Sequence, residues 1–297
     1  MEDEGVSLSN LGEEGLLRRL LTGLPSHPDL LVGPGDDCAV LATPDPSTVY
    51  LWKTDAVMSG SHFLPTDLPE RVGWKAAARL VSDFAAMGGG IPEHLLISLF
   101  ARADVSPAWL EGVYAGISRC AQTYGFSIAG GETSLLPPGG PLALFSLSLF
   151  GRLPKQDLIL RSTAQIGDDL WVTGALGGSF PSGRHLDFTP PLQVAQTIVR
   201  KATLSSMMDL SDGLAKDLPR LAQASQVGFQ LFLEELPKHP EITTEGALTD
   251  GEDYELLFTA PLSERDRLAP YAKRIGTMVP VEESDSLEGG WDSVCQR

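Results

Sequence analysis

Residues 70–87 carry the pattern that most limits how this chain can fold. Within this segment the apolar positions recur every three or four residues, at Val72, Ala76, Leu80, Phe84 and Met87. This spacing places them on one side of an α-helix. Three consecutive glycines follow at 88–90 and are typical of a helix C-terminus. The sequence therefore predicts a helix over residues 70–87 that packs against a core.

Strand and helix patterns are mixed on both sides of this helix. Further helices are predicted at 13–21, 108–124, 191–200 and 264–273, and strands at 49–53, 94–101, 142–150, 170–173, 229–233, 254–259 and 275–279. One more strand and helix are expected across 207–224. The glycine-rich segments 31–41, 130–133 and 178–185 are expected in loops or at the edges of elements. The mixture predicts an α+β fold.

The length of 297 residues favours two domains. After Gly151 and Pro154 the strand and helix pattern starts again, so a boundary is expected within 151–161. The predicted domains are residues 1–151 and residues 152–297. Each half has loops of glycine and aspartate beside strands, which faintly suggests two related halves.

The charge and the cysteines limit the partners and the location. The chain has 39 acidic and 22 basic residues, a net charge of −17, and no visible basic patch, which argues against binding nucleic acid or anionic lipid. The segment Met1–Glu4 is acidic where a signal peptide would be basic, and no apolar run approaches the roughly 18 residues of a membrane span. Three widely spaced cysteines, Cys38, Cys120 and Cys295, argue against a disulfide framework and a zinc site. A cytoplasmic enzyme is expected.

Five segments combine acidic residues with glycine or hydroxyl residues. They are Gly35-Asp36-Asp37, Lys53-Thr54-Asp55, Ser82-Asp83, Gly130-Gly131-Glu132-Thr133 and Asp209-Leu210-Ser211-Asp212-Gly213. Magnesium bound to phosphates takes only a few carboxylates per ion, and glycine lets backbone amides approach phosphate oxygens. Any one of these acids also fits a turn or a helix cap. Asp83 fits that alternative least, because its neighbours on the predicted helix are apolar and a buried carboxylate needs a partner.

Six motifs, taken together, resemble the thiamine-monophosphate kinase family. They are Gly35-Asp36-Asp37-Cys38-Ala39, Thr54-Asp55 with Gly60-x-His62-Phe63, Ser82-Asp83 through Gly88, Gly130-Gly131-Glu132-Thr133, Asp209 through Leu214, and Gly251-Glu252-Asp253-Tyr254-Glu255-Leu256. Their order and approximate spacing match the family from about residue 8 to residue 292. The resemblance implies a two-domain fold of the aminoimidazole-ribotide-synthetase type, an N-terminal domain that binds ATP and magnesium and dimerises through its sheet, and phosphorylation of thiamine monophosphate by ATP and Mg²⁺.

The resemblance also implies a role for individual residues. Those implied to bind magnesium are Asp36, Thr54, Asp55, Asp83, Glu132, Asp209 and Asp212, of which Asp55, Asp83 and Asp212 are the implied catalytic residues. Those implied to contact ATP are Gly131, Glu132, Arg161 and Ser211, and those implied to face thiamine monophosphate are His62, Glu252 and Trp291. Joining two phosphates brings like charges together, so cations between them and direct in-line transfer account for many acids and few nucleophiles. Arg161 also fits a surface ion pair, and Trp291 also fits simple packing.

Several positions differ from the family pattern. Lys53 stands where a serine or threonine is usual and Glu132 where an aspartate is usual, while Leu80, Asp250 and the Ser293-Val294 pair also differ, and the segment between Gly178 and Pro191 is shorter. Two alternatives follow. One is a homologue that binds the nucleotide or thiamine phosphate without turnover. The other is a related enzyme that uses ATP with another acceptor.

Overall fold

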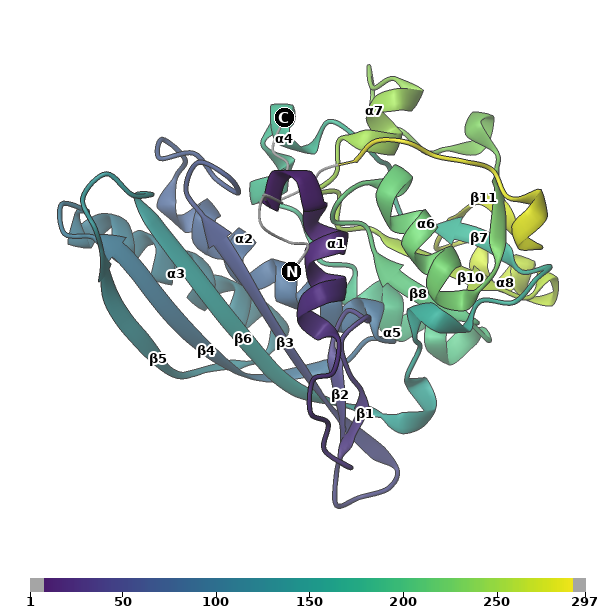
Figure 1. Cartoon of the computed structure of the whole chain (residues 1–297), viewed down its shortest axis with the longest axis horizontal. Helices are drawn as coiled ribbons and strands as arrows, with labels where there is room; N and C mark the ends of the chain where they lie inside the picture. Colours follow the sequence, from purple (N-terminus) through teal and green to yellow (C-terminus); the bar gives the residue numbers. More distant parts are fainter. Residues whose placement is uncertain (1–7, 291–297) are drawn as a thin grey trace, which may run out of the picture.

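The computed structural model describes residues 8–290, and Figure 1 shows two β-sheets side by side. Within these residues the larger sheet has six strands in the order β1-β2-β3-β6-β4-β5. Its strands are β1 (Leu30–Val32), β2 (Ala39–Ala42), β3 (Thr48–Met58), β4 (Ile91–Arg102), β5 (Ser127–Leu136) and β6 (Ala143–Pro154). Neighbouring strands are antiparallel except β4 and β5, which are parallel because a helix connects them.

Two helices, α2 (Pro69–Ala86) and α3 (Pro107–Tyr124), cover one face of this sheet. They approach each other closely through glycines. A Cβ on Gly73 would lie 1.9 Å from the carbonyl oxygen of Val113, and one on Gly116 would lie 2.0 Å from that of Glu70. Only glycine permits this contact. The α3 helix ends at Gly125, whose φ of 78° is left-handed.

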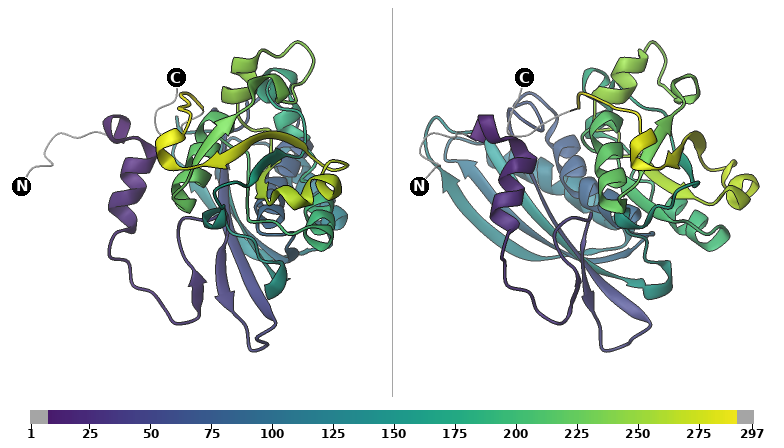
Figure 2. Two further views of the ribbon diagram at one scale, coloured as in Figure 1. Left: turned by 90° about the vertical axis from the view of Figure 1, so that its right-hand side faces the viewer. Right: turned by 45° about the vertical axis from the view of Figure 1, so that its right-hand side comes forward.

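The second sheet is antiparallel and has five strands in the order β8-β10-β7-β11-β9. These are β7 (Asp169–Val172), β8 (Ser206–Asp209), β9 (Gly228–Leu231), β10 (Leu256–Ala260) and β11 (Lys273–Val279). The helices of this half are α4 (Ser179–Ser182), α5 (Leu192–Lys201), α6 (Leu214–Ser225), α7 (Thr244–Thr249) and α8 (Arg265–Leu268). Figure 2 shows α1 (Leu8–Leu21), which has a kink at Gly12, standing away from the body near the junction of the two halves.

The two halves share an apolar core. One cluster of buried side chains includes Phe84 from α2, Phe145 from β6 and Phe258 from β10. The α2 helix is buried along most of its length because it packs on the first sheet and also on β8 and α5. It therefore holds groups from the first sheet beside the end of β8. The predicted boundary after residue 151 falls within β6 and stays a prediction.

Most elements follow their predicted ranges, and the differences are local. The helix at 70–87 is confirmed within a residue at each end. Residues 130–133 are not a loop but part of β5, and the segment 31–41 contains parts of β1 and β2. The helix expected at 264–273 is limited to α8, which follows a 3₁₀ turn. No helix within residues 8–290 is long and apolar enough to cross a membrane.

Candidate active site

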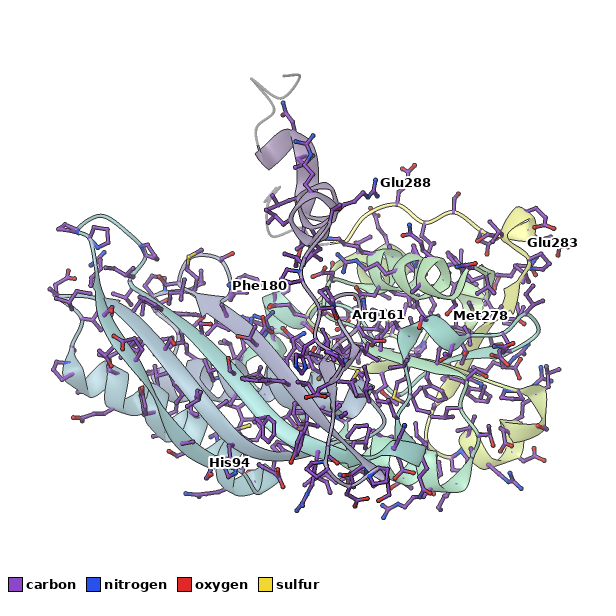
Figure 3. All side chains as sticks on the ribbon, turned by 60° about the horizontal axis from the view of Figure 1, so that its bottom comes forward. His94, Arg161, Phe180, Met278, Glu283 and Glu288 are labelled. Carbon is purple, nitrogen blue, oxygen red and sulfur yellow. The ribbon has the colours of Figure 1, made fainter. Side chains whose placement is uncertain are left out.

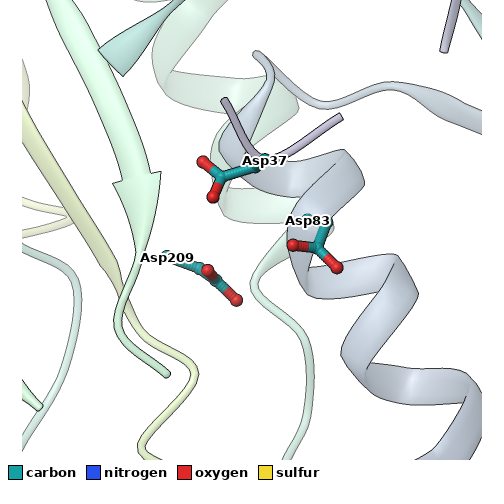
Figure 4. Close-up of side chains that lie close together, drawn as sticks. All are labelled: Asp37, Asp83 and Asp209. Carbon is teal, nitrogen blue, oxygen red and sulfur yellow. The ribbon is translucent and has the colours of Figure 1, made fainter. Parts of the chain in front are cut away.

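Three buried carboxylates meet where α2 faces the second sheet. Asp37 lies in the loop between β1 and β2, Asp83 in α2, and Asp209 at the end of β8. One carboxylate oxygen from each lies within 4.8 Å of the others. Figure 4 shows the three side chains turned toward a common space. Groups distant in the sequence are thus assembled at the spacing of ligands to a hard cation.

Burial disfavours negative charge on Asp83, on Asp209 and on the neighbouring Asp36. Burial, and then the charge of Asp37, raises the pKa of Asp209 to about 6. Burial raises the pKa of Asp83 well above its usual range, although Lys53 opposes this shift. Asp36 beside them also has its pKa raised to about 6, by burial and then by Asp37. Cationic ligands would therefore relieve an unfavourable charge.

Protein groups offset only part of this charge. Lys53 Nζ lies 2.7 Å from Asp83 Oδ1, and Ser82 Oγ donates to Asp209 Oδ2 at 2.6 Å. The Arg161 guanidinium pairs with Asp37 Oδ1. Asp37 Oδ2 is buried and has no hydrogen-bond partner within the described part of the chain. A buried carboxylate oxygen without a hydrogen-bond partner, in a cluster of acids, fits the role of a cation ligand.

The cluster opens into a cavity of about 510 Å³ between the two sheets. Its lining comes from α1, the first sheet and its loops, α2, the 3₁₀ turn Arg161–Thr163, α6, the end of β8 with the loop after it, and the loop before β10. The lining residues are Glu13, Leu17, Gly35, Asp36, Asp37, Lys53, Asp55, Ala56, His62, Arg79, Asp83, Arg161, Asp209, Ser211, Asp212, Arg220 and Tyr254. Figure 3 shows Arg161 between the two halves of the molecule. The cavity therefore combines acids with a few cations.

Ion pairs orient the outer acids of the cavity. Asp55 Oδ2 lies 3.0 Å from the Arg79 guanidinium, which is itself buried and donates to the Ala56 carbonyl oxygen at 2.8 Å. Asp212 Oδ2 lies 2.6 Å from Arg220, and Arg220 also contacts the buried Asp217 at 3.0 Å. Each of these acids thus has a fixed direction without a metal.

Two glycines allow the loops beside the cavity to cross. Gly213 and Gly251 have φ values of 101° and 69°. A Cβ on Gly213 would lie 3.0 Å from the carbonyl oxygen of Leu248, and one on Gly251 would lie 3.1 Å from that of Ser211. The Glu252 amide donates to the Ser211 carbonyl oxygen at 2.8 Å. This crossing holds Ser211 and Asp212 at the cavity wall.

His62 is held as a neutral imidazole. Its Nδ1 accepts a hydrogen bond from the Met58 amide at 3.1 Å. Burial, and then the charge of Arg79, lowers the pKa of His62 to about 4. Since Nδ1 is an acceptor, the proton of the neutral ring is on Nε2, and His62 presents a donor rather than a charge.

Comparison with known proteins identifies the family. A family model described as AIR synthase related protein, N-terminal domain, matches residues 35–153. The thiamine-monophosphate kinase of Escherichia coli (strain K12) is 34% identical over 286 residues, covering 86% of this chain and 85% of that protein. The one of Rhodopirellula baltica is 36% identical over 263 residues, covering 83% and 81%. This chain belongs to the thiamine-monophosphate kinase family.

A solved structure of the family agrees in fold over nearly the whole chain. The structure described as AaThiL complexed with AMPPCP and TMP has a TM-score of 0.84 and 30% identity, and the match covers 97% of this chain and 99% of that one. The predicted family and its aminoimidazole-ribotide-synthetase type of fold are therefore confirmed.

Many of the family motifs predicted from sequence meet at the cavity. Asp36, Asp55, Asp83, Asp209, Asp212, His62, Arg161 and Ser211 all line it. Glu252 does not line the cavity; its Oε1 lies 2.6 Å from Lys75 Nζ and 3.5 Å from the hydroxyl of Tyr254, which does line it. Trp291 lies outside the described residues.

Besides Glu252, three predicted residues of the described chain do not line the cavity. On β3, side chains alternate between the faces of the sheet, so Thr54 points away from Lys53 and Asp55 and is exposed. Thr54 Oγ1 donates to the Leu147 carbonyl oxygen instead. Gly131 and Glu132 lie in β5, three strand spacings from β3, which is roughly 14 Å.

The sequence interpretation missed several groups of the cavity. Asp37, rather than Asp36, joins the cluster of three acids. Arg79 and Arg220 were not considered. Arg79 precedes Asp83 by one helical turn, which was a signal, whereas Arg220 is eight residues from Asp212, which precedes α6. The Asp-Asp pair at 36–37 offered two candidate metal ligands, but sequence spacing does not say which of the two faces Asp83.

Proposed function

We propose that this chain transfers the γ-phosphoryl group of ATP to thiamine monophosphate and forms thiamine diphosphate, with Mg²⁺ held by Asp37, Asp83 and Asp209. The observation that carries this proposal is the meeting of these three carboxylates at a cavity between the two sheets, in a chain of the thiamine-monophosphate kinase family. The proposed two-domain division after residue 151 assigns Asp37 and Asp83 to the first domain and Asp209 to the second.

The donor set suits Mg²⁺. All three residues offer carboxylate oxygens, and Asp37 Oδ2 has no hydrogen-bond partner within the described residues. Burial raises the pKa of Asp83 and of Asp209 and so disfavours their charged forms. When bound, Mg²⁺ supplies positive charge that lets two anionic reactants approach. Asp36, Asp55 and Asp212 line the same cavity and are proposed as further ligands.

Other side chains orient the reactants. Arg161 is proposed to contact ATP phosphates, since its planar guanidinium already faces the cavity and matches phosphate geometry. Ser211, on the crossing loop, lines the same cavity and is also proposed to contact ATP. His62 is proposed to donate from Nε2 to an oxygen of thiamine monophosphate, a role that its lowered pKa supports because the ring stays neutral.

Direct in-line transfer accounts for the composition of the cavity. Cys38 lies next to the cluster, but burial raises the pKa of its thiol well above the usual range, so it is a poor nucleophile. The reaction then depends on position and charge rather than on a covalent intermediate. Cys38 and Cys120 are buried free thiols, which supports the predicted reducing, cytoplasmic location.

The activity has a direct test. Purified protein with ATP, MgCl₂ and thiamine monophosphate is expected to produce thiamine diphosphate and ADP in equal amounts, as measured by chromatography. Unphosphorylated thiamine is the control acceptor and is expected to give no product. Folded protein, verified by circular dichroism, that forms no thiamine diphosphate would exclude the proposed reaction.

Lys53 favours a second candidate, a homologue that binds the reactants without turnover. Its ammonium lies 2.7 Å from Asp83, where it competes with a metal ion for the carboxylate. This candidate predicts binding of AMPPCP and thiamine monophosphate by calorimetry without turnover, and turnover restored by Lys53→Ser combined with Glu132→Asp. Turnover by the unmodified chain excludes it.

The proposed homodimer forms through the face of the larger sheet opposite α2 and α3. This face has exposed apolar side chains, including Trp52 (48% exposed) and Leu96 (47% exposed), and in Figure 1 helices α2 and α3 lie behind it. Exposed apolar surface on a sheet is typical of an interface. Thr54 lies on the same face, and Gly131 and Glu132 lie at its edge, so their proposed contacts with metal and ATP depend on a second copy.

Leu96→Glu is expected to convert a dimer to a monomer, because it buries a charge in the proposed interface. Size-exclusion chromatography with light scattering measures the change. Leu262→Glu, at an exposed position of the second half (53% exposed), is the matched control and should leave the dimer intact. A wild-type monomer at micromolar concentration would contradict the proposed dimer.

A further inference from the structure

Lys75 is a fully buried lysine whose position the proposed chemistry does not explain. It lies in α2 with 0% of its surface exposed, among apolar neighbours of the core. Lysine is almost never fully buried unless it is paired, since removing an ammonium from water is unfavourable. Solubility and helix formation give no reason for a lysine here. The reason for a lysine at this position must therefore lie in the groups that it contacts.

The partners of Lys75 are two predicted substrate residues. Lys75 Nζ donates to the carbonyl oxygen of His62 at 2.6 Å and to Glu252 Oε1 at 2.6 Å. His62 follows β3 of the first sheet, and Glu252 precedes β10 of the second sheet. One ammonium group therefore connects the two loops that are proposed to face thiamine monophosphate.

The loop that carries Glu252 needs such a restraint. Glu252 and Tyr254 have φ values of 55° and 53°, a left-handed conformation that L side chains rarely adopt. A strained backbone persists only when its surroundings hold it in place. Here two backbone hydrogen bonds hold it, from Glu252 to Ser211 and from Tyr254 to Leu210, both at 2.8 Å. The bond from Lys75 Nζ to Glu252 Oε1 adds a side-chain restraint.

The charge of Glu252 helps Lys75 to keep its proton near neutral pH. Burial lowers the pKa of Lys75 to about 8, while Glu252 opposes this shift and Arg79 adds to it. The ammonium therefore remains protonated at pH 7.

We propose that Lys75 is a positioning residue for the phosphoryl acceptor, which fixes Glu252 and the His62 loop across the two halves of the chain. This inference rests on the proposed function, since it assigns thiamine monophosphate to these loops. Lys75 does not line the cavity and does not touch the reacting atoms. Its loss is therefore expected to weaken acceptor binding and to spare the nucleotide, which binds at the acidic cluster.

Binding is the direct test, because it does not require turnover. Calorimetry of the full chain with Mg²⁺ gives separate Kd values for thiamine monophosphate and for AMPPCP. Lys75→Met, which keeps the approximate length and volume, is expected to raise the Kd for thiamine monophosphate at least about tenfold. The Kd for AMPPCP is expected to stay within about twofold. Val72→Ala, a core change in the same helix, is the control that lowers the melting temperature and leaves both Kd values unchanged.

Glu252→Gln keeps the test valid if Lys75→Met fails to fold, and a double-mutant cycle completes it where Lys75→Met folds. Glu252→Gln alone should also raise the Kd for thiamine monophosphate, with Lys75 still present. The double variant Lys75→Met/Glu252→Gln should melt at a higher temperature than Lys75→Met, since no unpaired buried carboxylate remains, and should bind the acceptor no worse than Lys75→Met. Additive effects, or equal loss of both ligands, would overturn the positioning role. A wild-type chain that binds no thiamine monophosphate would reject the proposed function itself.

Discussion

Asp209→Asn is expected to reduce turnover about 100-fold or more and to leave the free energy of unfolding in metal-free buffer unchanged or slightly higher. The amide is a weaker ligand for Mg²⁺ than the carboxylate and does not neutralise its charge. Its oxygen still accepts the hydrogen bond that Ser82 Oγ donates at 2.6 Å. Removing one of three clustered acids also relieves repulsion in the absence of metal. Steady-state kinetics and urea denaturation in EDTA measure the two effects.

The pH dependence of stability checks the same residue. Burial raises the pKa of Asp209 to about 6 in the folded chain, above an unfolded value of about 3.9. The folded state therefore binds this proton more tightly, and the free energy of unfolding in EDTA falls as the pH rises from about 4 to about 7. In Asp209→Asn this decrease should be smaller. Asp266→Asn, at an exposed position of α8, is the control for charge alone.

Two results would contradict this account of Asp209. Unchanged turnover in the variant would mean that the metal site is elsewhere. A large loss of stability in EDTA would mean that the carboxylate holds the fold together. Asp55→Asn gives a less clear answer, since it leaves the buried Arg79 without its carboxylate partner and is expected to lower stability for that reason.

Periodicity explains which elements the sequence could predict. The helix at 70–87 was predictable because its apolar positions follow one period and three glycines end it. The strand β5 was not, because Gly130 and Gly131 look like a turn. In the structure Gly131 is required by pairing, since a Cβ there would lie 1.8 Å from the Ile97 carbonyl oxygen. The glycine at 131 therefore reflects close pairing between two strands and not a turn.

The same limit applies to the candidate site. Glycine and hydroxyl neighbours indicated which acidic segments matter, and Asp83 and Asp209 do meet. Spacing could not separate Asp36 from Asp37, because the choice depends on how the loop turns: Asp36 Oδ2 accepts from the Arg161 amide, whereas Asp37 faces Asp83. Strand alternation, in contrast, already predicts opposite directions for Thr54 and Asp55. Both residues were assigned to the magnesium site only because of the family resemblance.

Lys53→Met is expected to have opposite effects on stability and on metal affinity. Without the ammonium, Asp83 loses its counter-ion beside Asp37 and Asp209, and the free energy of unfolding in EDTA should fall by about 2 kcal/mol. Magnesium no longer meets a competing cation at Asp83, so its apparent affinity should rise about tenfold or more. Melting temperature measured against MgCl₂ concentration, with AMPPCP present, reports both quantities.

A fall in stability together with a rise in magnesium affinity is expected only for a lysine that occupies the cation site. Lys273→Met breaks an ion pair with Glu235 in which both side chains are about half exposed, and it should change neither quantity noticeably. If Lys53→Met lowers stability but leaves magnesium affinity unchanged, the ammonium is only a structural partner of Asp83. If affinity rises and turnover rises with it, Lys53 limits catalysis in this chain. If affinity rises while turnover falls, the ammonium itself acts on the phosphates, since charge at that point is then needed even when magnesium binds better.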